Sequence, residues 1–394
     1  MWDHGGGFPD LSVAGWPVRL PTDIGPFPTR VNPARIMNKT RIALFEGNPG
    51  QVVLRNVPLP GPAAGETLVK VLGCTLCGSD LHSFEGRRQV PVPTILGHEI
   101  VGEIIDQGPG SPREDLQGQS LNPGDRVTWA IVAHCGDCFF CRRGLPQKCL
   151  RGVKYGHEPF RGERSLNGGL ASHCLLAPGS TLHRLPPEIP LGMVIPASCA
   201  TATIAAACEA AGDLRGAEVG ILGAGLLGLT ACAMAHDRGA SRVFCVEPGP
   251  QRRARAVDFG AVTCESADQL KSQLQSFAAP PGLDVVLEVS GSSAALEQAL
   301  PLLRIGGTAV LVGAVFPGPP AAIVPEQIVR RQLTLRGVHN YAPRHLQQAV
   351  DFLSGAAGRW PLADLVTDWI PLDEIGRAFA LARDPARIRV GVVP

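Results

Sequence analysis

The first half of the chain carries short, alternating hydrophobic runs separated by Gly and Pro turns. Between about 40 and 200, β-type runs occur at 67–72, 100–105 and 126–132, and no long amphipathic helix interrupts them. This pattern predicts a mostly β domain.

Near residue 203 the pattern changes, and apolar runs begin to alternate with Ala/Leu-rich segments. Strands are predicted at 218–222, 242–246, 285–289 and 308–312. Such alternation is typical of a parallel, doubly wound sheet, so we expect an α/β protein with a nucleotide-binding domain at 203–340. The last segment contains a predicted helix at 345–353 and is expected to return to the first domain, which then spans 37–202 and 341–394.

Composition sets broad limits on the function. A chain of 394 residues, 45% of them hydrophobic, can fill two cores. The net charge of +1 offers no basic surplus for nucleic acid. The most apolar stretch, 219–235, is broken by glycines and is short for a bilayer span, so we expect no membrane segment. No export signal opens the chain, so we expect a cytoplasmic location.

Residues 1–36 are rich in Pro and Gly and lack periodicity, so we expect a poorly ordered leader. Met37 stands just before a strand-like opening at 39–45 and is therefore a second candidate start of translation.

Twelve cysteines in a chain without an export signal indicate metal binding rather than disulfides. Four of them form the pattern C-x2-C-x2-C-x7-C at Cys135, Cys138, Cys141 and Cys149. Four thiolates at this spacing can close a tetrahedron around Zn²⁺ within the loop 135–149, which predicts a structural zinc with no open position. Four unrelated thiols and a nucleic-acid zinc ribbon are the alternatives, and the spacing and the charge balance disfavour them.

A second, distributed set consists of Cys77 in C-G-S-D-L-H, His98 in G-H-E, and Cys199 in P-A-S-C-A-T-A-T. Two cysteines and one histidine leave a zinc ion with a fourth position free for water or an alcohol, as catalysis requires. Taken alone, His98 is more often a hydrogen-bonded loop histidine and Cys199 a small buried hydrophobe. Their occurrence together favours a catalytic metal.

The third pattern is G-x-G-x-x-G at Gly223, Gly225 and Gly228, directly after a predicted strand and opening a helix. Glycines at such a turn let the backbone approach a pyrophosphate, and Glu247, 19 residues after Gly228, can hold the adenosine ribose. The alternative is a glycine-tolerant packing turn. An acid at 247 repels a 2′-phosphate and favours NAD over NADP, although Arg252 and Arg253 lie close enough to soften that preference.

With these motifs in this order, the chain from Met37 onward resembles the zinc-dependent medium-chain alcohol dehydrogenase/reductase family. The resemblance implies a GroES-like catalytic domain, a Rossmann cofactor domain, two zinc ions per chain, NAD, and a homodimer or homotetramer. It further implies a small alcohol or aldehyde as the substrate. Thr75 departs from the family, which usually has glycine there, and Cys74 adds a thiol close to the site.

The resemblance also assigns roles residue by residue. Cys77, His98 and Cys199 are implied as ligands of the catalytic zinc, and Ser79 and His82 as a proton relay through the cofactor ribose. Asp80 is implied to orient His98, and Glu99 to lie behind the metal. The residues implied to contact the cofactor are Thr203, Gly223, Gly225, Leu227, Gly228, Glu247, Arg252 and Arg389, with Thr203 and Arg389 at the nicotinamide and pyrophosphate.

A narrower resemblance is to the subgroup associated with phosphonate catabolism. It is carried by T-L-C-G-S-D-L-H at 75–82, G-R-R at 86–88, G-L-P-Q-K-C at 144–149 and K-Y-G-H-E at 154–158. An anionic substrate needs cations near the zinc, and Arg87, Arg88, Lys154 and His157 are candidates. The alternatives are solvated surface charges here, and a neutral polyol or secondary alcohol as the substrate.

The reaction implied is reversible hydride transfer between an alcohol and a nicotinamide, in a cleft between the two domains. Two competitors are a non-catalytic zinc- and nucleotide-binding protein and a zinc-free quinone or enoyl reductase. The presence of all the catalytic candidates disfavours both.

Overall fold

A computed structural model of the protein describes residues 39–277 and 280–394. The predicted leader and the alternative start at Met37 lie outside the described residues. The other predictions can be compared with the elements that the structure contains.

The first domain is built mostly from antiparallel strand pairs, and β17 and β18 pair in parallel. Its largest sheet has the strand order β10-β6-β5-β3-β18-β17, and β9 also pairs with β3. The bounds are β3 (Thr67–Thr75), β5 (Glu99–Gln107), β6 (Arg126–Trp129), β9 (His173–Leu176), β10 (Leu182–Arg184), β17 (Val366–Pro371) and β18 (Arg389–Val393). The predicted run 126–132 is interrupted, because β6 ends at Trp129 and a new strand begins at Val132.

Smaller sheets and short helices complete this domain. One sheet has the order β2-β1-β4 and another pairs β7 with β8. Their bounds are β1 (Lys39–Phe45), β2 (Val53–Pro58), β4 (Thr94–Ile95), β7 (Val132–Ala133) and β8 (Val153–Lys154). The helical segments are α1 (Gly78–Phe84), α2 (Phe139–Arg142), η2 (Pro146–Lys148), η3 (Glu163–Ser165), α3 (Leu191–Val194), η4 (Ile195–Ser198), η5 (Leu362–Leu365), η6 (Leu372–Glu374) and α11 (Ile375–Ala382).

The second domain is a six-stranded parallel sheet with the order β13-β12-β11-β14-β15-β16. Numbered from β11, this is the 3-2-1-4-5-6 order of dinucleotide-binding sheets. The strands are β11 (Glu218–Leu222), β12 (Arg242–Val246), β13 (Val262–Cys264), β14 (Leu283–Glu288), β15 (Leu303–Leu311) and β16 (Thr334–Gly337). The helices are α4 (Ala200–Ala211), α5 (Leu226–Asp237), α6 (Pro250–Asp258), α7 (Ala267–Phe277), α8 (Ser293–Leu302), α9 (Pro325–Arg331) and α10 (Pro343–Ala356).

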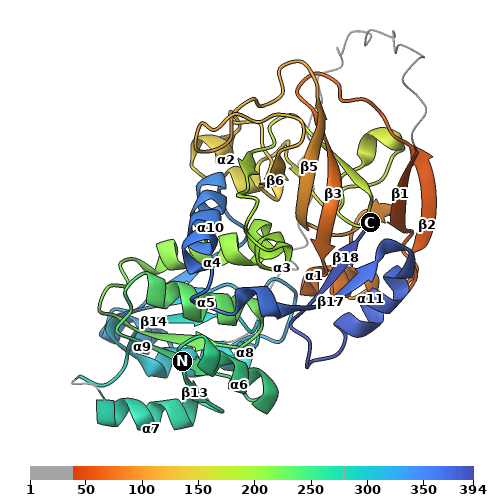
Figure 1. Ribbon diagram of the computed structural model, residues 1–394. Helices are drawn as coiled ribbons and strands as arrows, with labels where there is room; N and C mark the ends of the chain where they lie inside the picture. The colour runs from red at the N-terminus through yellow and green to blue at the C-terminus, as the bar shows by residue number, and fades with distance from the viewer. Residues whose placement is uncertain (1–38, 278–279) are drawn as a thin grey trace, which may run out of the picture. The chain divides into compact units, whose positions relative to one another are not determined.

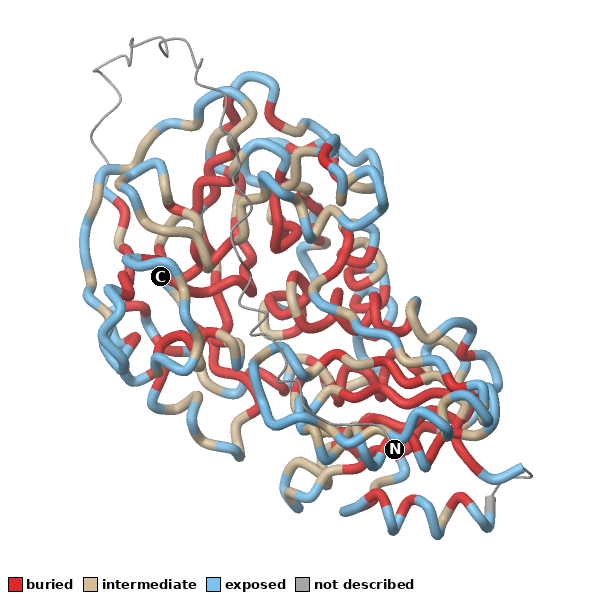
Figure 2. The backbone as a smooth tube through the Cα atoms, turned by 180° about the vertical axis from the view of Figure 1, so that it is seen from behind, coloured by how far each residue is buried: buried red, intermediate tan, exposed pale blue. Residues whose placement is uncertain are grey.

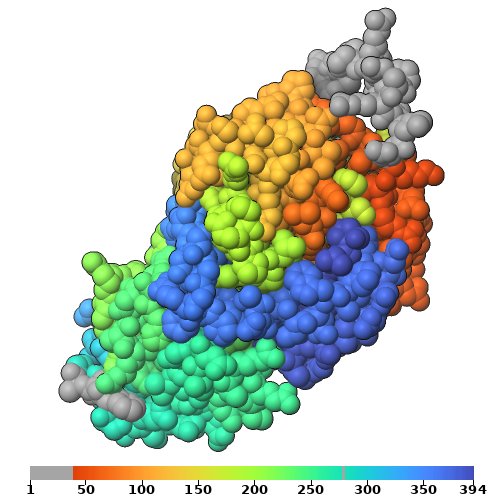
Figure 3. Space-filling view, in the orientation of Figure 1, coloured from red at the N-terminus to blue at the C-terminus, as the bar shows by residue number. Residues whose placement is uncertain are grey.

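The C-terminal segment joins the first domain again. β18 pairs antiparallel with β3 and parallel with β17, so the final strand lies next to the strand that leads to Cys77 (Figure 1). On the face shown in Figure 3, this blue segment lies between the orange residues of the first domain and the green nucleotide domain. The α/β fold class, with a mostly β domain and a doubly wound parallel sheet, is confirmed; the boundaries at 202/203 and 340/341 stay predictions.

Buried residues concentrate on the strands and on the helices packed against them, and the loops between them are exposed (Figure 2). One apolar cluster fills the first domain, another lies on one face of the parallel sheet, and the largest extends from the other face through α4, α5 and α10 into the first domain. These apolar clusters stabilise the loops that carry the functional side chains.

Within the described residues, no single helix has the length and hydropathy needed to cross a membrane. One pair, Leu191–Ser198 with Ala200–Ala211, meets that test by length and composition, with a bend of 58° between its parts.

Candidate active site

Three residues that are far apart in the sequence converge on one point. Cys77 precedes α1, His98 precedes β5, and Cys199 lies between η4 and α4. One ligand atom from each lies within 4.8 Å of the others. This donor set, two sulfurs and one imidazole, suits a Zn²⁺ ion with a free fourth position.

Asp80 holds two of these residues in place. Its Oδ2 accepts a hydrogen bond from the Cys77 amide at 3.0 Å, and its Oδ1 lies 3.2 Å from His98 Nδ1. Oδ1 also accepts from the Gly97 amide at 3.0 Å. A proton on Nδ1 then leaves the His98 Nε2 lone pair facing the cluster, as metal coordination requires. Ser79 Oγ lies 3.3 Å from that Nε2.

Glu99 and Arg389 lie together behind the cluster. The guanidinium donates from Nε to Oε2 at 3.0 Å and from Nη2 to Oε1 at 2.8 Å. Nη2 is also 3.5 Å from Cys77 Sγ, and Thr75 Oγ1 donates to Glu99 Oε2 at 2.5 Å. Thr75, the residue that departs from the family pattern, therefore provides a hydrogen bond to the buried carboxylate of Glu99. The resemblance implied a contact between Arg389 and the pyrophosphate. In the structure Arg389 lines the cleft and donates from Nε and Nη2 to Glu99, and its contact with the cofactor stays a prediction.

Neighbouring charges and burial shift the pKa values of several groups in the cluster. A hydrogen bond from the Cys199 thiol, and then the positive charge of Arg389, hold the pKa of Cys77 well below its ordinary value. Burial alone lowers the pKa of His98, but the neighbouring Asp80 and Cys77 outweigh it and raise that pKa to about 10. Burial raises the pKa of Glu99 to about 7. A metal ion bound here would compete with a proton for His98 Nε2, because a metal-binding imidazole must be neutral.

Cys74 does not belong to the cluster. It is fully buried on β3, and burial raises the pKa of its thiol well above the ordinary value. It fills space beneath Gly97, where an added Cβ would come within 2.7 Å of its sulfur. The extra thiol is a packing residue.

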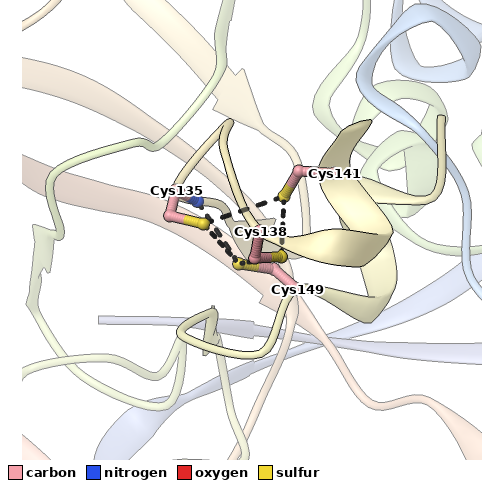
Figure 4. Close-up of side chains that lie close together, drawn as sticks. All are labelled: Cys135, Cys138, Cys141 and Cys149. Atoms are coloured by element: carbon pink, nitrogen blue, oxygen red, sulfur yellow. Dashed lines mark hydrogen bonds between the residues drawn. The ribbon is translucent and has the colours of Figure 1, made fainter. Parts of the chain in front are cut away.

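The second group that could hold a metal is the predicted loop of four cysteines, whose sulfurs face one another (Figure 4). The Sγ atoms of Cys138 and Cys141 are 3.5 Å apart, those of Cys135 and Cys149 are 3.4 Å apart, and two further pairs are separated by 3.9 Å. A zinc–sulfur bond of about 2.3 Å gives tetrahedral edges of about 3.8 Å, so the four thiols fit a closed zinc site.

The glycine turn follows β11 and opens α5. Gly223 has a φ of +106°, which disfavours any residue with a side chain. A Cβ on Gly228 would lie 1.8 Å from the Gly223 carbonyl oxygen, whereas a Cβ on Gly225 would meet nothing within 4 Å. Gly223 and Gly228 thus shape the turn, and Gly225 leaves its outer side open at a helix N-terminus, where a phosphate group can approach.

Glu247 lies beside this turn at the end of β12. Its Oε2 accepts from the Ala224 amide at 2.8 Å, and its Oε1 accepts from the Gly249 amide at 2.9 Å. Arg253 donates to the Glu247 carbonyl at 2.8 Å, and Arg252 Nε donates to the Pro385 carbonyl at 2.9 Å. Each arginine therefore has a protein acceptor.

A cleft of about 640 Å³ contains the three converging residues and receives side chains from both domains. Of the predicted site residues, Ser79, His82, Thr203, Gly225, Leu227 and Arg252 also line it. His82 stacks on Phe316, with the ring centroids 4.3 Å apart. Phe316 follows β15 and belongs to no motif, so no local pattern predicted this contact across the cleft.

Arg88, Lys154 and His157 line the wall of the same cleft, but burial holds the pKa of His157 well below its ordinary value, so this ring is neutral and the cations are Arg88 and Lys154. Arg88 Nη1 is 2.7 Å from His157 Nε2, and His157 Nδ1 donates to the Tyr155 carbonyl at 2.8 Å. Burial and the neighbouring Arg88 lower the pKa of Lys154 to about 8. Arg87 does not line the cleft: its exposed guanidinium pairs with Glu85.

Lys148 and His339 were not singled out from the sequence. His339 also lines the cleft, and Lys148, next to Cys149, hydrogen-bonds to its Nδ1. Burial, and then Lys148, lower the pKa of His339 to about 4, so its ring is neutral and accepts this bond. No local spacing connects residues 148 and 339.

The fold and the site together define a two-domain oxidoreductase that uses a metal ion and a dinucleotide. The family comparisons agree. Residues 63–187 match the alcohol dehydrogenase GroES-like domain, and residues 227–355 match the zinc-binding dehydrogenase domain. The chain belongs to the zinc-dependent medium-chain alcohol dehydrogenase family. This membership implies zinc, a nicotinamide cofactor and small-molecule alcohol substrates.

Individual relatives span nearly the whole chain. The L-threonine 3-dehydrogenase of Pyrococcus horikoshii is 30% identical, covering 88% of this chain and 97% of that protein. The crystal structure of an alcohol dehydrogenase from Thermotoga maritima superposes with a TM-score of 0.85 at 28% identity, covering 91% of this chain and 100% of that one. The alcohol dehydrogenase TADH from Thermus sp. ATN1 gives 0.78 at 30% identity, covering 90% and 99%.

Proposed function

We propose that the protein is an NAD-dependent alcohol dehydrogenase whose catalytic zinc is held by Cys77, His98 and Cys199. The observation that carries this proposal is the convergence of their ligand atoms within 4.8 Å in a cleft that also contains Gly225 of the dinucleotide turn. When bound, zinc polarises the oxygen of the substrate, and the nicotinamide exchanges hydride with the adjacent carbon.

The protein side chains prepare this chemistry in three ways. Asp80 fixes the orientation and the tautomer of His98, because its Oδ1 and the His98 Nδ1 form a buried hydrogen bond. Arg389 keeps the pKa of Cys77 low and neutralises Glu99 behind it. The walls of both domains limit the access of water to the reacting atoms.

Ser79 and His82 carry the proton in this proposal. Ser79 Oγ is beside the metal-facing nitrogen of His98, and His82 lines the same cleft farther along α1. Burial lowers the pKa of His82, so its ring is neutral near pH 7 and able to accept a proton. We propose that Ser79 accepts the proton of the substrate hydroxyl and that His82 passes it to solvent; a bound cofactor would supply the ribose hydroxyls that connect the two side chains.

The preference for NAD rests on Glu247. Its carboxylate is held against the glycine turn by two main-chain amides, where a 2′-phosphate of NADP would meet its negative charge. Arg252 is the nearby cation that lines the cleft, but its Nε is used by the Pro385 carbonyl.

A second zinc in the four-cysteine loop has a structural role in this proposal, because four thiolates leave no position for a substrate. The loop has little core of its own: Phe139, Leu145 and Leu150 are exposed. Lys148 precedes the last of the four cysteines, so an ordered loop also places this cation next to His339.

We further propose that the substrate carries an anionic group, with a small phosphonate as the leading candidate. In the part of the chain that the structure describes, neither Arg88 nor Lys154 has an acid within ion-pair distance, and burial together with the charge of Arg88 lowers the pKa of Lys154. An anion would relieve that repulsion. His157 contributes to this wall as a neutral ring that accepts from Arg88, and Arg87 contributes no charge to it because its guanidinium pairs with Glu85.

A homodimer or homotetramer is also proposed. β16 is one of the two edge strands of the parallel sheet, and Ile305 on β15 and Val329 on α9 are 74% and 75% exposed. An open edge with apolar side chains nearby favours contact with another copy. Light scattering coupled to gel filtration measures this directly.

The test of function is an NADH absorbance assay on zinc-loaded protein with simple alcohols, neutral polyols, L-threonine and 2-hydroxyethylphosphonate in parallel. We expect NAD reduction with at least one alcohol and the highest kcat/KM for the phosphonate. The variant Lys154→Met should lower kcat/KM for the phosphonate alone, and Lys271→Met, an exposed control on α7, should change nothing. A preference for neutral polyols would remove the phosphonate, and no reduction with any of these alcohols would contradict the dehydrogenase assignment.

A further inference from the structure

The chain has two tyrosines, Tyr155 and Tyr341, and both are buried, with 0% and 2% of their surface exposed. A buried tyrosine hydroxyl needs hydrogen-bond partners, and each of these makes more than one. Only the partners of Tyr341 lie beside the proposed catalytic metal site.

The Tyr341 hydroxyl connects two segments of the first domain. It donates to the carbonyl oxygen of Ser198 and accepts from the amide of Ile131 at 3.1 Å. Ser198 immediately precedes Cys199, and Ile131 lines the cleft. One hydroxyl therefore ties the neighbour of a proposed ligand to the wall of the cleft.

The side chain of Ser198 extends this connection to a second proposed ligand. Its Oγ donates to the His98 carbonyl at 3.4 Å and accepts from the Ile100 amide at 3.3 Å. Ser198 is thus held by its carbonyl on one side and by its hydroxyl on the other. The segments around 98, 131, 198 and 341 become one hydrogen-bonded unit.

Cys199 needs this support because it lies at the break between η4 and α4. Its φ and ψ of −136° and −76° are not helical, and the two helical segments meet at 58°. Local hydrogen bonds hold its own main chain, since its amide donates to the Pro196 carbonyl at 3.2 Å and its carbonyl accepts from the Thr203 amide at 2.9 Å. These bonds stay within each helical segment, so the tertiary contacts of Ser198 tie the bend between the segments to the rest of the site.

We propose that Tyr341 and Ser198 are positioning residues that hold Cys199 in register with His98 for metal binding. This inference rests on the proposed function, because it assumes that these two residues are ligands. Neither positioning side chain contacts the substrate or the cofactor in this account. They act on the metal through the main chain of its ligands.

The test compares Tyr341→Phe with the matched control Tyr155→Phe. The Tyr155 hydroxyl also makes buried hydrogen bonds, to the Ala177 amide at 2.9 Å and to Ser180. These partners lie in a turn whose Gly179 carbonyl accepts from the His134 amide, so they support the side of the four-cysteine loop and not the residues next to Cys199 and His98. The two variants lose the same atom from equally buried sites. Zinc content is measured during competition with a chelator, and cobalt(II) spectra report the ligand geometry.

For Tyr341→Phe we expect one of the two metals to bind about 10–100-fold more weakly and its cobalt bands to shift, as for other losses of indirect ligand support. Tyr155→Phe should retain the metal at Cys77, His98 and Cys199 with wild-type affinity, even if its melting temperature falls equally. Ser198→Ala should resemble Tyr341→Phe, and the double variant should be less than additive. Ser198→Ala also decides the matter if Tyr341→Phe fails to fold.

Wild-type affinity and an unchanged cobalt spectrum in both Tyr341→Phe and Ser198→Ala would overturn the inference and leave the proposed function intact. A wild-type protein that binds metal only at the four-cysteine loop would instead contradict the proposed function, and the inference with it. The wild-type measurement therefore separates the two failures.

Discussion

Arg389 and Glu99 form a two-point ion pair behind Cys77, with nitrogen–oxygen distances of 3.0 and 2.8 Å. Both groups are nearly inaccessible to solvent: the side chain of Arg389 is 9% exposed and that of Glu99 0%. The pair joins the last strand of the chain to β5, and so it ties the C-terminus to the floor of the site.

Removal of Arg389 leaves a buried carboxylate with Thr75 as its remaining side-chain partner. We expect Arg389→Met to destabilise the protein by about 3–5 kcal/mol, because the carboxylate of Glu99 would then be an unpaired charge that water cannot reach. The matched control is Arg377→Met, whose pair with Glu374 is exposed and should be worth about 1 kcal/mol or less. Urea unfolding followed by tryptophan fluorescence measures both, and equal losses would contradict the role of burial.

The charge of Lys154 should make the use of an anionic substrate dependent on pH. Its pKa is lowered to about 8, so the free enzyme loses this positive charge as the pH rises through that value. We expect kcat/KM for 2-hydroxyethylphosphonate, relative to that for a neutral alcohol, to be highest below pH 8 and to fall above it. The same ratio in Lys154→Met should be low and flat, and a ratio that rises with pH in the wild type would reject the assignment.

The same substitution at two glycines of the dinucleotide turn should affect two different properties: stability at Gly228 and NADH affinity at Gly225. Gly228→Ala places a methyl group 1.8 Å from the Gly223 carbonyl oxygen, so α5 cannot pack as it does and the melting temperature should drop sharply. Gly225→Ala meets open space and should fold normally, but the methyl group obstructs the approach of the pyrophosphate. We expect its NADH affinity to fall about tenfold, or 1.4 kcal/mol. NADH titration by fluorescence and thermal unfolding distinguish the two, and wild-type NADH binding by Gly225→Ala would argue against this turn as the cofactor site.

The parts of the site that could be predicted from the sequence are those with short spacing. The four cysteines span 15 positions, and the glycine turn stands directly between a strand and a helix, so local geometry nearly determines their arrangement. The prediction that Cys77, His98 and Cys199 lie together depended on the order of the motifs along the chain, because no short-range spacing places residue 199 next to residue 77.

Tertiary contacts explain what was not predicted. Arg389 meets Glu99 across 290 positions, and Phe316 and His339 enter the cleft from segments without a motif. The fold shows the same limit at β15, which begins at Leu303 rather than 308. Gly306 and Gly307 resemble a turn, but pairing with β14 accommodates them through a register shift.

The central claim is that Cys77, His98 and Cys199 together bind one metal ion, and that a second ion binds in the four-cysteine loop. Zinc analysis of Cys199→Ala tests it, with Cys208→Ala as the matched control, since Cys208 is a buried thiol on the same helix outside both cysteine groups. We predict two zinc ions in the wild type and in Cys208→Ala, and one zinc with no dehydrogenase activity in Cys199→Ala. Two zinc ions and full activity in Cys199→Ala would contradict the account.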